Sequence, residues 1–295
     1  MSGRARRAAT GWFWCEGNRV FERVERDGIA VHTDPGLFTA SGVGIAFSER
    51  GGGVSHAPYD SLDLAPHVGD AAAAVDENRR RLLGAIGIAV LRDRLTTAEQ
   101  VHGTQIVEVT AANAGAGAYA GRGPGPAAGA DALWTRDRGI PLLLLFADCV
   151  PVILVRPSIP AVAVVHAGWR GAAVGIVGLA ARAMVALGRG DDLTAYIGAH
   201  ICASCYEVGE EVHAAFGGRP TSPGVSHSGN ASDTLSRAAR PLDLARIVTE
   251  ELARSGVTEE RQWHLGICTA QNTDRFYSYR AEGLTGRHGA LAVIL

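Results

Sequence analysis

Three consecutive apolar runs near the middle of the chain constrain its fold more than any other feature of the sequence. PLLLLFA covers residues 141–147, PVILV covers 151–155 and AVAVVHA covers 161–167. Each run has the length of a strand, and none of them alternates between apolar and polar residues. Continuous apolar strands are typical of a sheet that is covered on both faces. The sequence therefore predicts a buried sheet at the centre of the protein.

Segments before and after these runs predict the layers that cover the sheet. We expect helices at 75–87, 172–187 and 242–254, and further strands at 43–47, 193–199, 263–268 and 290–295. Residues 97–109 predict two extended stretches that join at His102 and Gly103. No internal repeat is visible, and the polar segments do not divide the hydrophobic pattern into two halves. The prediction is one layered α/β domain with a mixed sheet.

Composition and charge exclude several classes of function. The 295 residues carry a formal net charge of −2, and 47% of them are hydrophobic. This charge provides no attraction to nucleic acid or to an anionic membrane, and the apolar runs are too short to span a bilayer. Residues 1–17 are basic but lack the apolar core of a signal peptide. We expect a cytoplasmic protein with reduced thiols. Residues 1–42 are expected to form an N-terminal arm ahead of the catalytic domain.

Two segments that are poor in large apolar side chains predict loops. Residues 111–130 are almost all Ala, Gly and Pro, and residues 217–240 form a second, polar stretch. The first segment offers few side chains that can anchor it, and its glycines raise the entropic cost of ordering it. We expect residues 111–130 to be mobile and to act, at most, as a lid beside the site.

Reactive side chains occur where two of the apolar strands end. Cys149 follows the first run, and His166 lies near the end of the third. Because open α/β sheets place their sites outside strand ends, these side chains predict a shared rim. The glycine after His102 allows a close backbone approach, so His102 can reach the same rim. The three residues lack any short metal-binding spacing, and each one alone is more often a hydrogen-bonded or inert core residue.

Two arginines beside glycine-rich turns are candidates for phosphate binding. Arg170 lies in HAGWRGAAVG, residues 166–175, which runs from a strand into a helix. The start of a helix attracts anions, and a guanidinium binds them in a bidentate manner. Arg50 precedes three glycines whose amides can face an anion. The alternative is that these glycines only make tight turns and that both arginines are solvated.

Seven segments together resemble one known family. They are SERGGGVSHAPYDSLDLAPHVGDAAAAVDENRRRL, EQVHGTQIVEV, ADALWT, ADCVPVIL, AVVHAGWRG, CYEVGEEV and SYRAEGLTGR, in this order between residues 48 and 287. In these segments the chain is similar to the YfiH family of laccase-domain proteins, and QVHG, ADCVP and HAGWRG in combination are highly specific. The resemblance implies a single α/β/α-type domain with a mixed sheet over residues 43–295.

The resemblance also implies a metal and an activity. Zinc is expected at the His of QVHG, the Cys of ADC and the His of HAGWRG, which are His102, Cys149 and His166, and these would also be the catalytic residues. Two imidazoles and one thiolate suit zinc and leave a fourth position for water or substrate. Family members are described as phosphorolysing adenosine, inosine, guanosine and methylthioadenosine, and as deaminating adenosine. The expected ligands are thus a purine nucleoside and phosphate, the latter held by Arg50 and Arg170.

Two other interpretations use the same residues. In the first, the protein is a Cys/His hydrolase or amidase with Cys149 as nucleophile and His166 as base, as would suit family members described as peptidoglycan editing factors. In the second, the zinc is structural. A multicopper oxidase is excluded, because such enzymes need many histidines, commonly in H-x-H pairs. None of the ten histidines of this chain lies two positions from another.

The chain also departs from the family pattern at several positions. Asp63 stands where the family usually has Asn, and Ser48 and Glu49 stand where it has two threonines. Cys202 and Cys205 form a CxxC in an unusual segment, but no second CxxC accompanies it. We therefore favour a structural or pocket-wall role for Cys205 over redox chemistry or a second zinc site at the CxxC. The departures bear on substrate preference more than on metal binding.

Overall fold

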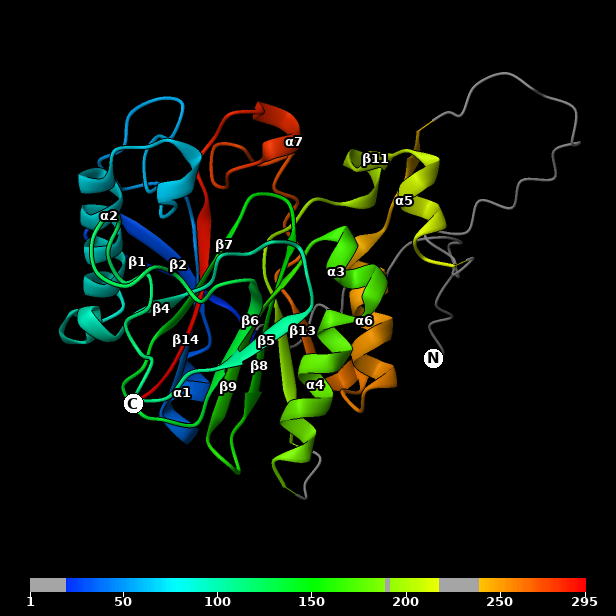
Figure 1. The fold of residues 1–295 in the computed structure, drawn as a ribbon, viewed down its shortest axis with the longest axis horizontal. Coiled ribbons are helices and arrows are strands. Elements are labelled where there is room, and N and C mark those ends of the chain that lie inside the picture. The colour runs from blue at the N-terminus through cyan, green and yellow to red at the C-terminus, as the bar shows by residue number, and fades with distance from the viewer. Residues whose placement is uncertain (1–19, 189–191, 218–238) are drawn as a thin grey trace, which may run out of the picture.

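The computed structural model describes residues 20–188, 192–217 and 239–295. The first 17 residues and nearly all of the predicted loop at 217–240 lie outside these ranges. Within them, the strands form two six-stranded sheets and one two-stranded ribbon (Figure 1).

The first sheet has the strand order β1-β2-β3-β14-β7-β4. Its strands are β1 (Glu22–Arg26), β2 (Ile29–Thr33), β3 (Val43–Ser48), β14 (His288–Ile294), β7 (Leu142–Phe146) and β4 (Thr96–Thr97). Strands β4 and β7 are parallel, and the other neighbours are antiparallel. The last strand of the chain therefore lies in the middle of this sheet, between β3 and β7.

The second sheet has the order β13-β10-β8-β9-β6-β5. Its strands are β13 (Gln262–His264), β10 (Thr194–Ile197), β8 (Val150–Arg156), β9 (Ala161–Ala167), β6 (Ala130–Thr135) and β5 (Gln105–Glu108). The outermost pair at each edge is parallel, and the inner pairs are antiparallel. The ribbon consists of β11 (Glu207–Val208) and β12 (Arg240–Pro241).

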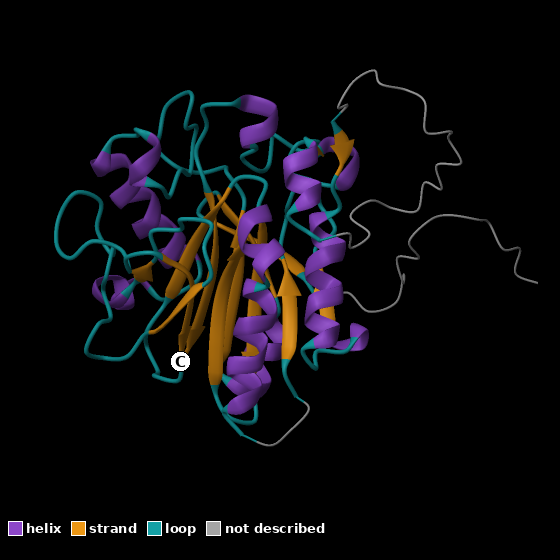
Figure 2. Cartoon of the chain, turned by 45° about the vertical axis from the view of Figure 1, so that its right-hand side comes forward, coloured by secondary structure: helices purple, strands orange, loops and turns teal. Residues whose placement is uncertain are grey.

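Helices cover the outer face of each sheet, as Figure 2 shows. Helices α3 (Trp169–Val174), α4 (Ile176–Ala186) and α6 (Leu244–Arg254) pack on the second sheet, and α2 (Ala72–Ala85) packs on the first. The short helices are α1 (Pro35–Ser41), α5 (Glu210–Ala214) and α7 (Tyr279–Glu282). No helix in the described ranges is long and apolar enough to cross a bilayer. The predicted mixed α/β class is confirmed, with the strands divided between two sheets packed face to face.

Strand β7 illustrates why the central runs are apolar at every position. Leu142, Leu144 and Phe146 point into the layer between the two sheets. Leu143 and Leu145, which alternate with them, point to the cluster under α2. Because successive side chains of a strand face opposite sides, a strand between two apolar layers has no solvent-facing position. The predicted burial on both faces is therefore correct for β7, and every residue of β8 and β9 is buried as well.

The helix predicted at 172–187 is interrupted. Gly175 has a φ of 93° and separates α3 from α4. A left-handed residue ends an α-helix, and glycine adopts this conformation without steric cost. The helical segment also starts earlier than predicted, at Trp169, and only Gly168 separates it from β9.

The predicted N-terminal arm at 1–42 is wrong for the part that the structure describes. Strands β1 and β2 extend the first sheet beside β3. His32 on β2 hydrogen-bonds to Glu49 at 2.9 Å, and both side chains are buried. The hydroxyl of Tyr196 on β10 donates to Asp34 at 2.8 Å, which ties α1 to the second sheet. Residues 22–41 therefore belong to the domain, because their apolar strand residues complete its core.

The predicted mobile lid at 111–130 is also corrected. Ala118 and Ala120 are buried, and Ala118 belongs to the apolar cluster under α2. The fully buried guanidinium of Arg79 donates to the carbonyl of Gly117 at 2.7 Å. No residue of this segment lines the cavity described below. Small side chains allow residues 115–120 to pack against the domain, whereas residues 121–126 are exposed and lie away from the cavity.

Candidate metal centre and pocket

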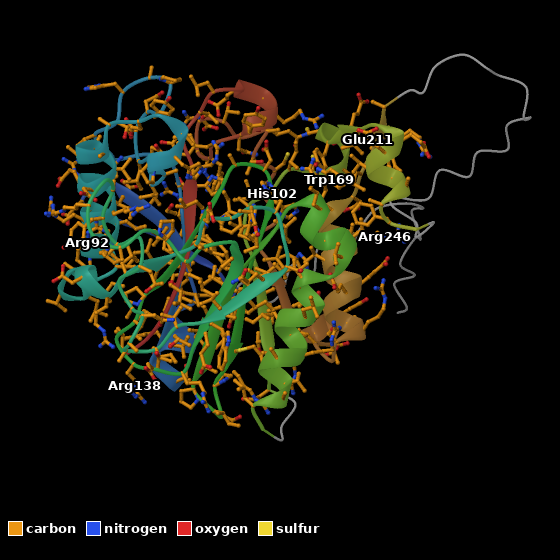
Figure 3. The ribbon with its side chains drawn as sticks, viewed as in Figure 1. Arg92, His102, Arg138, Trp169, Glu211 and Arg246 are labelled. Carbon is orange, nitrogen blue, oxygen red and sulfur yellow. The ribbon has the colours of Figure 1, made fainter. Side chains whose placement is uncertain are left out.

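His102, Cys149 and His166 come together at one end of the sheets. Each offers a ligand atom, and these three atoms lie within 4.8 Å of one another. His102 Nε2 is 3.7 Å from Cys149 Sγ, and the two imidazole rings meet edge to face with centroids 4.8 Å apart. Figure 3 labels His102 and Trp169, the first residue of α3, and both line the cavity described below. The structure thus brings the three predicted side chains into one cluster.

Two connections and one strand supply these side chains. Residues 147–149 link β7 to β8, so Cys149 lies where the chain passes from the first sheet to the second. His166 lies on β9, opposite Pro151 at the start of β8. His102 lies in the turn between β4 and β5. The cluster therefore depends on the packing of both sheets, which no short sequence spacing can encode.

The turn that carries His102 is held on both sides. His102 has a φ of 62°, which costs energy for a residue other than glycine. The buried carboxylate of Asp131 accepts hydrogen bonds from the amides of His102 and Gly103 at 2.9 and 2.7 Å. The side chain of Gln100 exchanges hydrogen bonds of 2.7 and 2.9 Å with the backbone of Leu145 on β7. These contacts fix the imidazole of His102 beside Cys149.

Asp131 is a site residue that the sequence analysis did not assign. Its Oδ1 lies 2.8 Å from Nδ1 of His166, so Nε2 is the nitrogen of His166 that remains available to a ligand. A carboxylate behind a histidine fixes the tautomer and raises the basicity of the ring. Burial raises the pKa of Asp131, but His166 and the two amides outweigh burial and lower it. The available signal was an acidic residue inside the apolar strand ADALWT, since a buried carboxylate needs partners.

Gly168 provides the space for this cluster. A Cβ at this position would clash with Cδ2 of His102 and lie 3.3 Å from Cys149 Sγ. Gly168 is also the N-cap of α3, where the backbone is extended. The first glycine of HAGWRG is therefore needed for the close approach of the backbone to His102 and Cys149.

Cys149 and His166 form a coupled acid–base pair. Burial raises the pKa of Cys149, but the charge of His166 and hydrogen bonds with both histidines outweigh it and lower the pKa to about 6. Burial lowers the pKa of His166, but the Cys149 thiolate and Asp131 outweigh it and raise the pKa to about 9. At neutral pH the protein's own charges therefore favour a thiolate beside an imidazolium. A cation that binds here meets a preformed thiolate and displaces the proton of His166.

The donor set and its spacing fit zinc. Nitrogen and sulfur ligands at about 2.1 and 2.3 Å from a tetrahedral zinc ion lie about 3.6 Å apart. The observed separation of His102 Nε2 and Cys149 Sγ is 3.7 Å. Asp131 behind His166 is the outer partner that metal-binding histidines commonly have. The donor set thus suits zinc, and the separation of His102 Nε2 and Cys149 Sγ matches two ligands of one tetrahedral ion.

A cavity of about 410 Å³ opens over the cluster. Its lining joins the three cluster residues with arginines, aromatic rings and a few other side chains, among them Trp169, Arg170, Tyr206, Tyr279, Arg280, Arg287, His67 and Asp148. The predicted phosphate-binding residue Arg170 thus lies at the pocket. Arg280 and Arg287 lie there too, and the sequence analysis did not single them out. Three guanidinium groups give this pocket the charge that attracts an anion.

Asp148 organises one wall of the pocket. Its Oδ1 accepts hydrogen bonds from the hydroxyls of Thr269 and Ser278, both at 2.7 Å, and its Oδ2 accepts one from the amide of Arg280 at 2.6 Å. The four described residues other than glycine with positive φ are Asp27, Gln100, His102 and Asp148, and the last three line the pocket. A strained backbone persists only where surrounding contacts hold it in place, and such residues cluster at functional sites.

Arg50 is not among the residues that line the pocket. Its Nε donates to the carbonyl of Asp60 at 2.9 Å, and its Nη1 donates to the carbonyl of Thr273 at 2.6 Å. Nη1 also pairs with Glu282 at 2.7 Å, and the guanidinium lies 4.3 Å from the ring centre of Tyr277. These contacts occupy the donors that phosphate would need. The structure therefore places Arg50 as a buried link between the 58–62 loop and the C-terminal segment.

The glycines after Arg50 have a structural role, although Arg50 itself is buried and not solvated as the alternative above supposed. A Cβ at Gly52 would clash with the carbonyl of Gly28, and a Cβ at Gly53 would clash with the carbonyl of Ser61. The amide of Gly53 donates to the hydroxyl of Ser61 at 3.0 Å. These glycines allow backbone segments to approach one another, and they do not line the pocket.

Comparisons with known proteins agree with this architecture. The family model described as multi-copper polyphenol oxidoreductase laccase matches residues 44–295. A purine nucleoside phosphorylase of Pseudomonas aeruginosa is 35% identical over 246 residues, which cover 82% of this chain and 89% of the relative. The purine nucleoside phosphorylase YlmD of Geobacillus stearothermophilus is 36% identical over 274 residues, which cover 91% of this chain and 94% of the relative.

Solved structures show the same fold. The crystal structure of YlmD from Geobacillus stearothermophilus superimposes with a TM-score of 0.79 at 32% identity, covering 93% of this chain and 98% of that one. The hypothetical protein YfiH of Bacillus licheniformis superimposes with a TM-score of 0.81 at 26% identity, covering 94% of this chain and 100% of that one. The chain therefore belongs to the YfiH family of laccase-domain proteins.

Proposed function

We propose that this protein is a zinc-dependent enzyme that cleaves purine nucleosides with phosphate. The observation that carries this proposal is the convergence of His102, Cys149 and His166 in a pocket that three arginines line. The names of the relatives in Pseudomonas and Geobacillus, both purine nucleoside phosphorylases, support the substrate class.

The zinc would be held by His102, Cys149 and His166, with Asp131 orienting His166. When bound, the metal supplies a Lewis acid that polarises an oxygen atom of the substrate or of water. Asp131 keeps the proton of His166 on Nδ1 and thus keeps Nε2 free for coordination. Gln100 and Asp131 hold the His102 turn in place, so the ligands need not reorganise when the metal binds.

The pocket arginines would hold the phosphate. Within the described part of the chain, no oxygen atom accepts a hydrogen bond from the guanidinium of Arg170, so its donors are available to a ligand. The group stacks over the ring of Trp169 at 4.3 Å, which fixes its plane. Arg280 lies over the ring of Tyr206 at 5.0 Å and is anchored through its amide to Asp148. Planar guanidinium groups bind phosphate in a bidentate manner and stabilise its charge.

Phosphorolysis then requires positioning more than covalent catalysis. A phosphate oxygen forms a bond to C1′ of the ribose while the bond between C1′ and N9 breaks. The leaving base takes up the proton that hydrogen phosphate gives up, and the products are a free purine and ribose 1-phosphate. The arginines hold the nucleophile, and the rings of Trp169, Tyr206 and Tyr279 offer flat surfaces for the purine. We propose that the same pocket deaminates adenosine, where water adds at C6 and ammonia leaves.

A thiol hydrolase is the second candidate function. It is favoured by one observation, the lowered pKa of Cys149 beside a protonated His166, because a thiolate is the reactive form of a cysteine nucleophile. Such an enzyme needs no metal. Removal of metal with a chelator therefore separates the candidates, since it abolishes the proposed zinc chemistry and spares a thiol hydrolase.

Incubation of the purified protein with adenosine, with and without phosphate, tests the proposed reaction. Phosphorolysis predicts adenine and ribose 1-phosphate only when phosphate is present. Inosine in both incubations would indicate deamination. Adenosine that stays intact in both, with the zinc site filled, would contradict the proposal.

A further inference from the structure

Three cysteines lie together in a second cluster, outside the zinc ligands proposed above. Cys202 precedes the 3-10 turn Ala203–Cys205 that follows β10, Cys205 ends this turn, and Cys268 lies beyond β13. Their three sulfur atoms lie within 4.8 Å of one another. The CxxC pair was visible in the sequence, whereas Cys268 joins it only through the fold.

Backbone hydrogen bonds hold these cysteines in position. The amide of His200 donates to the carbonyl of Ile267 at 3.2 Å, and the amide of Thr269 donates to the carbonyl of His200 at 3.0 Å. This parallel bridge aligns Cys268 with the segment that leads into Cys202. The amide of Cys205 donates to the carbonyl of Cys202 at 3.0 Å and closes the turn between them. The convergence of the thiols thus rests on the main chain.

Donors around the sulfur atoms favour negative charge. The amide of Cys202 donates to Sγ of Cys268 at 3.3 Å, and the hydroxyl of Ser204 lies 3.2 Å from Sγ of Cys202. Two of the three sulfur atoms thus have polar neighbours that can support a metal-bound thiolate.

We propose that Cys202, Cys205 and Cys268 form a second zinc site with three thiolate ligands and a water molecule as the fourth. Sulfur ligands at about 2.3 Å from a tetrahedral zinc ion lie about 3.8 Å apart, which the observed cluster accommodates. A metal ion would use all three converging thiols, whereas a disulfide would use two of the thiols and leave the third unpaired. Cys202 and Cys205 are partly exposed, so an ion can enter from solvent.

The second ion would tie together two segments that form the pocket. Ile201 and Tyr206, which neighbour Cys202 and Cys205 in the chain, line the pocket. Thr269, which follows Cys268, donates to Asp148 beside Cys149. The role that follows is structural, because the ion would hold these segments in register without contacting the substrate.

Cadmium binding to the full chain tests this site. The Cys149→Ala variant removes the thiolate of the first site, so any thiolate absorption comes from other cysteines. Metal-free Cys149→Ala protein should take up Cd²⁺ with a near-ultraviolet thiolate-to-metal band that saturates at one ion per chain, and zinc should displace it. The melting temperature of this variant should rise when the ion binds.

Matched variants complete the test in the same background. Cys202→Ser should lose the band and the melting-temperature shift while keeping its circular dichroism spectrum, because this side chain is partly exposed. Cys15→Ser, which lies outside the described residues, should keep both. The proposal is overturned if Cys149→Ala gives no band, if Cys202→Ser leaves the band unchanged, or if the isolated protein lacks two hydrogens in mass because these cysteines form a disulfide.

Discussion

Asp131 and His166 are joined by a hydrogen bond of 2.8 Å between Oδ1 and Nδ1, and both side chains are buried. The same carboxylate accepts hydrogen bonds from the amides of His102 and Gly103. One buried group therefore positions two of the three candidate zinc ligands, and a change at Asp131 acts on both histidines at once.

Asp131→Asn should lower zinc affinity and nucleoside cleavage by about 10–100-fold, since loss of an outer partner typically has this effect. The amide keeps the shape of the carboxylate but removes its charge, and one of its two acceptor atoms becomes a donor. Competition with a chelator measures the affinity. Asp274→Asn, at an exposed position, is the control and should change neither quantity. Unchanged zinc affinity in Asp131→Asn would show that the carboxylate serves the fold alone.

Gly168→Ala should displace His102 and lower zinc occupancy while the protein stays folded, because the added methyl group clashes with the imidazole. Gly84→Ala is the matched control. Gly84 lies inside α2, and a Cβ there meets no atom within 4 Å. The control should keep its zinc and gain roughly 0.5–1 kcal/mol in the free energy of unfolding. Metal analysis and thermal melting measure both variants, and full occupancy in Gly168→Ala would contradict the site geometry.

Arg170→Lys and Arg50→Lys should have different effects. Arg170→Lys should raise the KM for phosphate roughly tenfold, because lysine cannot reproduce the bidentate fork, and should spare deamination. Arg50→Lys should instead lower the free energy of unfolding by roughly 2–4 kcal/mol, since it breaks buried hydrogen bonds to Thr273 and Glu282. Steady-state kinetics at varied phosphate and denaturant titrations distinguish these effects. An increase in phosphate KM that is the same in both variants would mean that Arg170 has no specific role.

Asp63 should make the protein less stable as the pH rises. Burial raises the pKa of Asp63 from 3.8 to about 7, although the amides of Arg287 and Ala65 donate to it. Between these two pKa values the folded state binds a proton that the unfolded state has lost, so the free energy of unfolding falls with pH. The loss is complete above about pH 7 and amounts to at most about 4 kcal/mol.

Asp63→Asn should remove this loss, because the amide carries no charge at any of these pH values. The variant should melt at a higher temperature than the native protein at pH 8, and the difference should shrink toward pH 4. The same Asp274→Asn control should follow the native protein at each pH. A melting-temperature difference that is independent of pH would indicate that the carboxyl group of Asp63 does not titrate as described.

The sequence predicted those parts of the fold that local patterns determine. The apolar runs at 141–147, 151–155 and 161–167 became β7, β8 and β9, because a strand buried on both faces has no polar position. The division into two sheets was not predictable in this way. It depends on residues 147–149 carrying the chain between layers, and three residues of loop contain no signal of their destination.

The candidate site shows the same limit. His102, Cys149 and His166 were named from strand ends and from the family resemblance, and the fold brings them together. Asp131 was missed, since its role depends on the pairing of β6 with β9, two strands that are far apart in the sequence. Arg50 was placed with the phosphate because glycines follow it, but these glycines serve backbone packing. Residues 111–130 were expected to be mobile, but residues 115–120 are packed against the domain. Composition alone cannot distinguish a flexible loop from a closely packed one.

Zinc titration of the metal-free protein tests the central claim most directly. Cys202→Ser and Cys205→Ser are introduced first, so that only the site at His102, Cys149 and His166 takes up the ion. Phosphate-dependent release of hypoxanthine from inosine is then followed as zinc is added. The account predicts that activity rises from near zero and saturates at one zinc ion per chain, and that Cys149→Ala stays inactive throughout. Full activity in the metal-free protein, or activity that is unchanged by zinc, would contradict it.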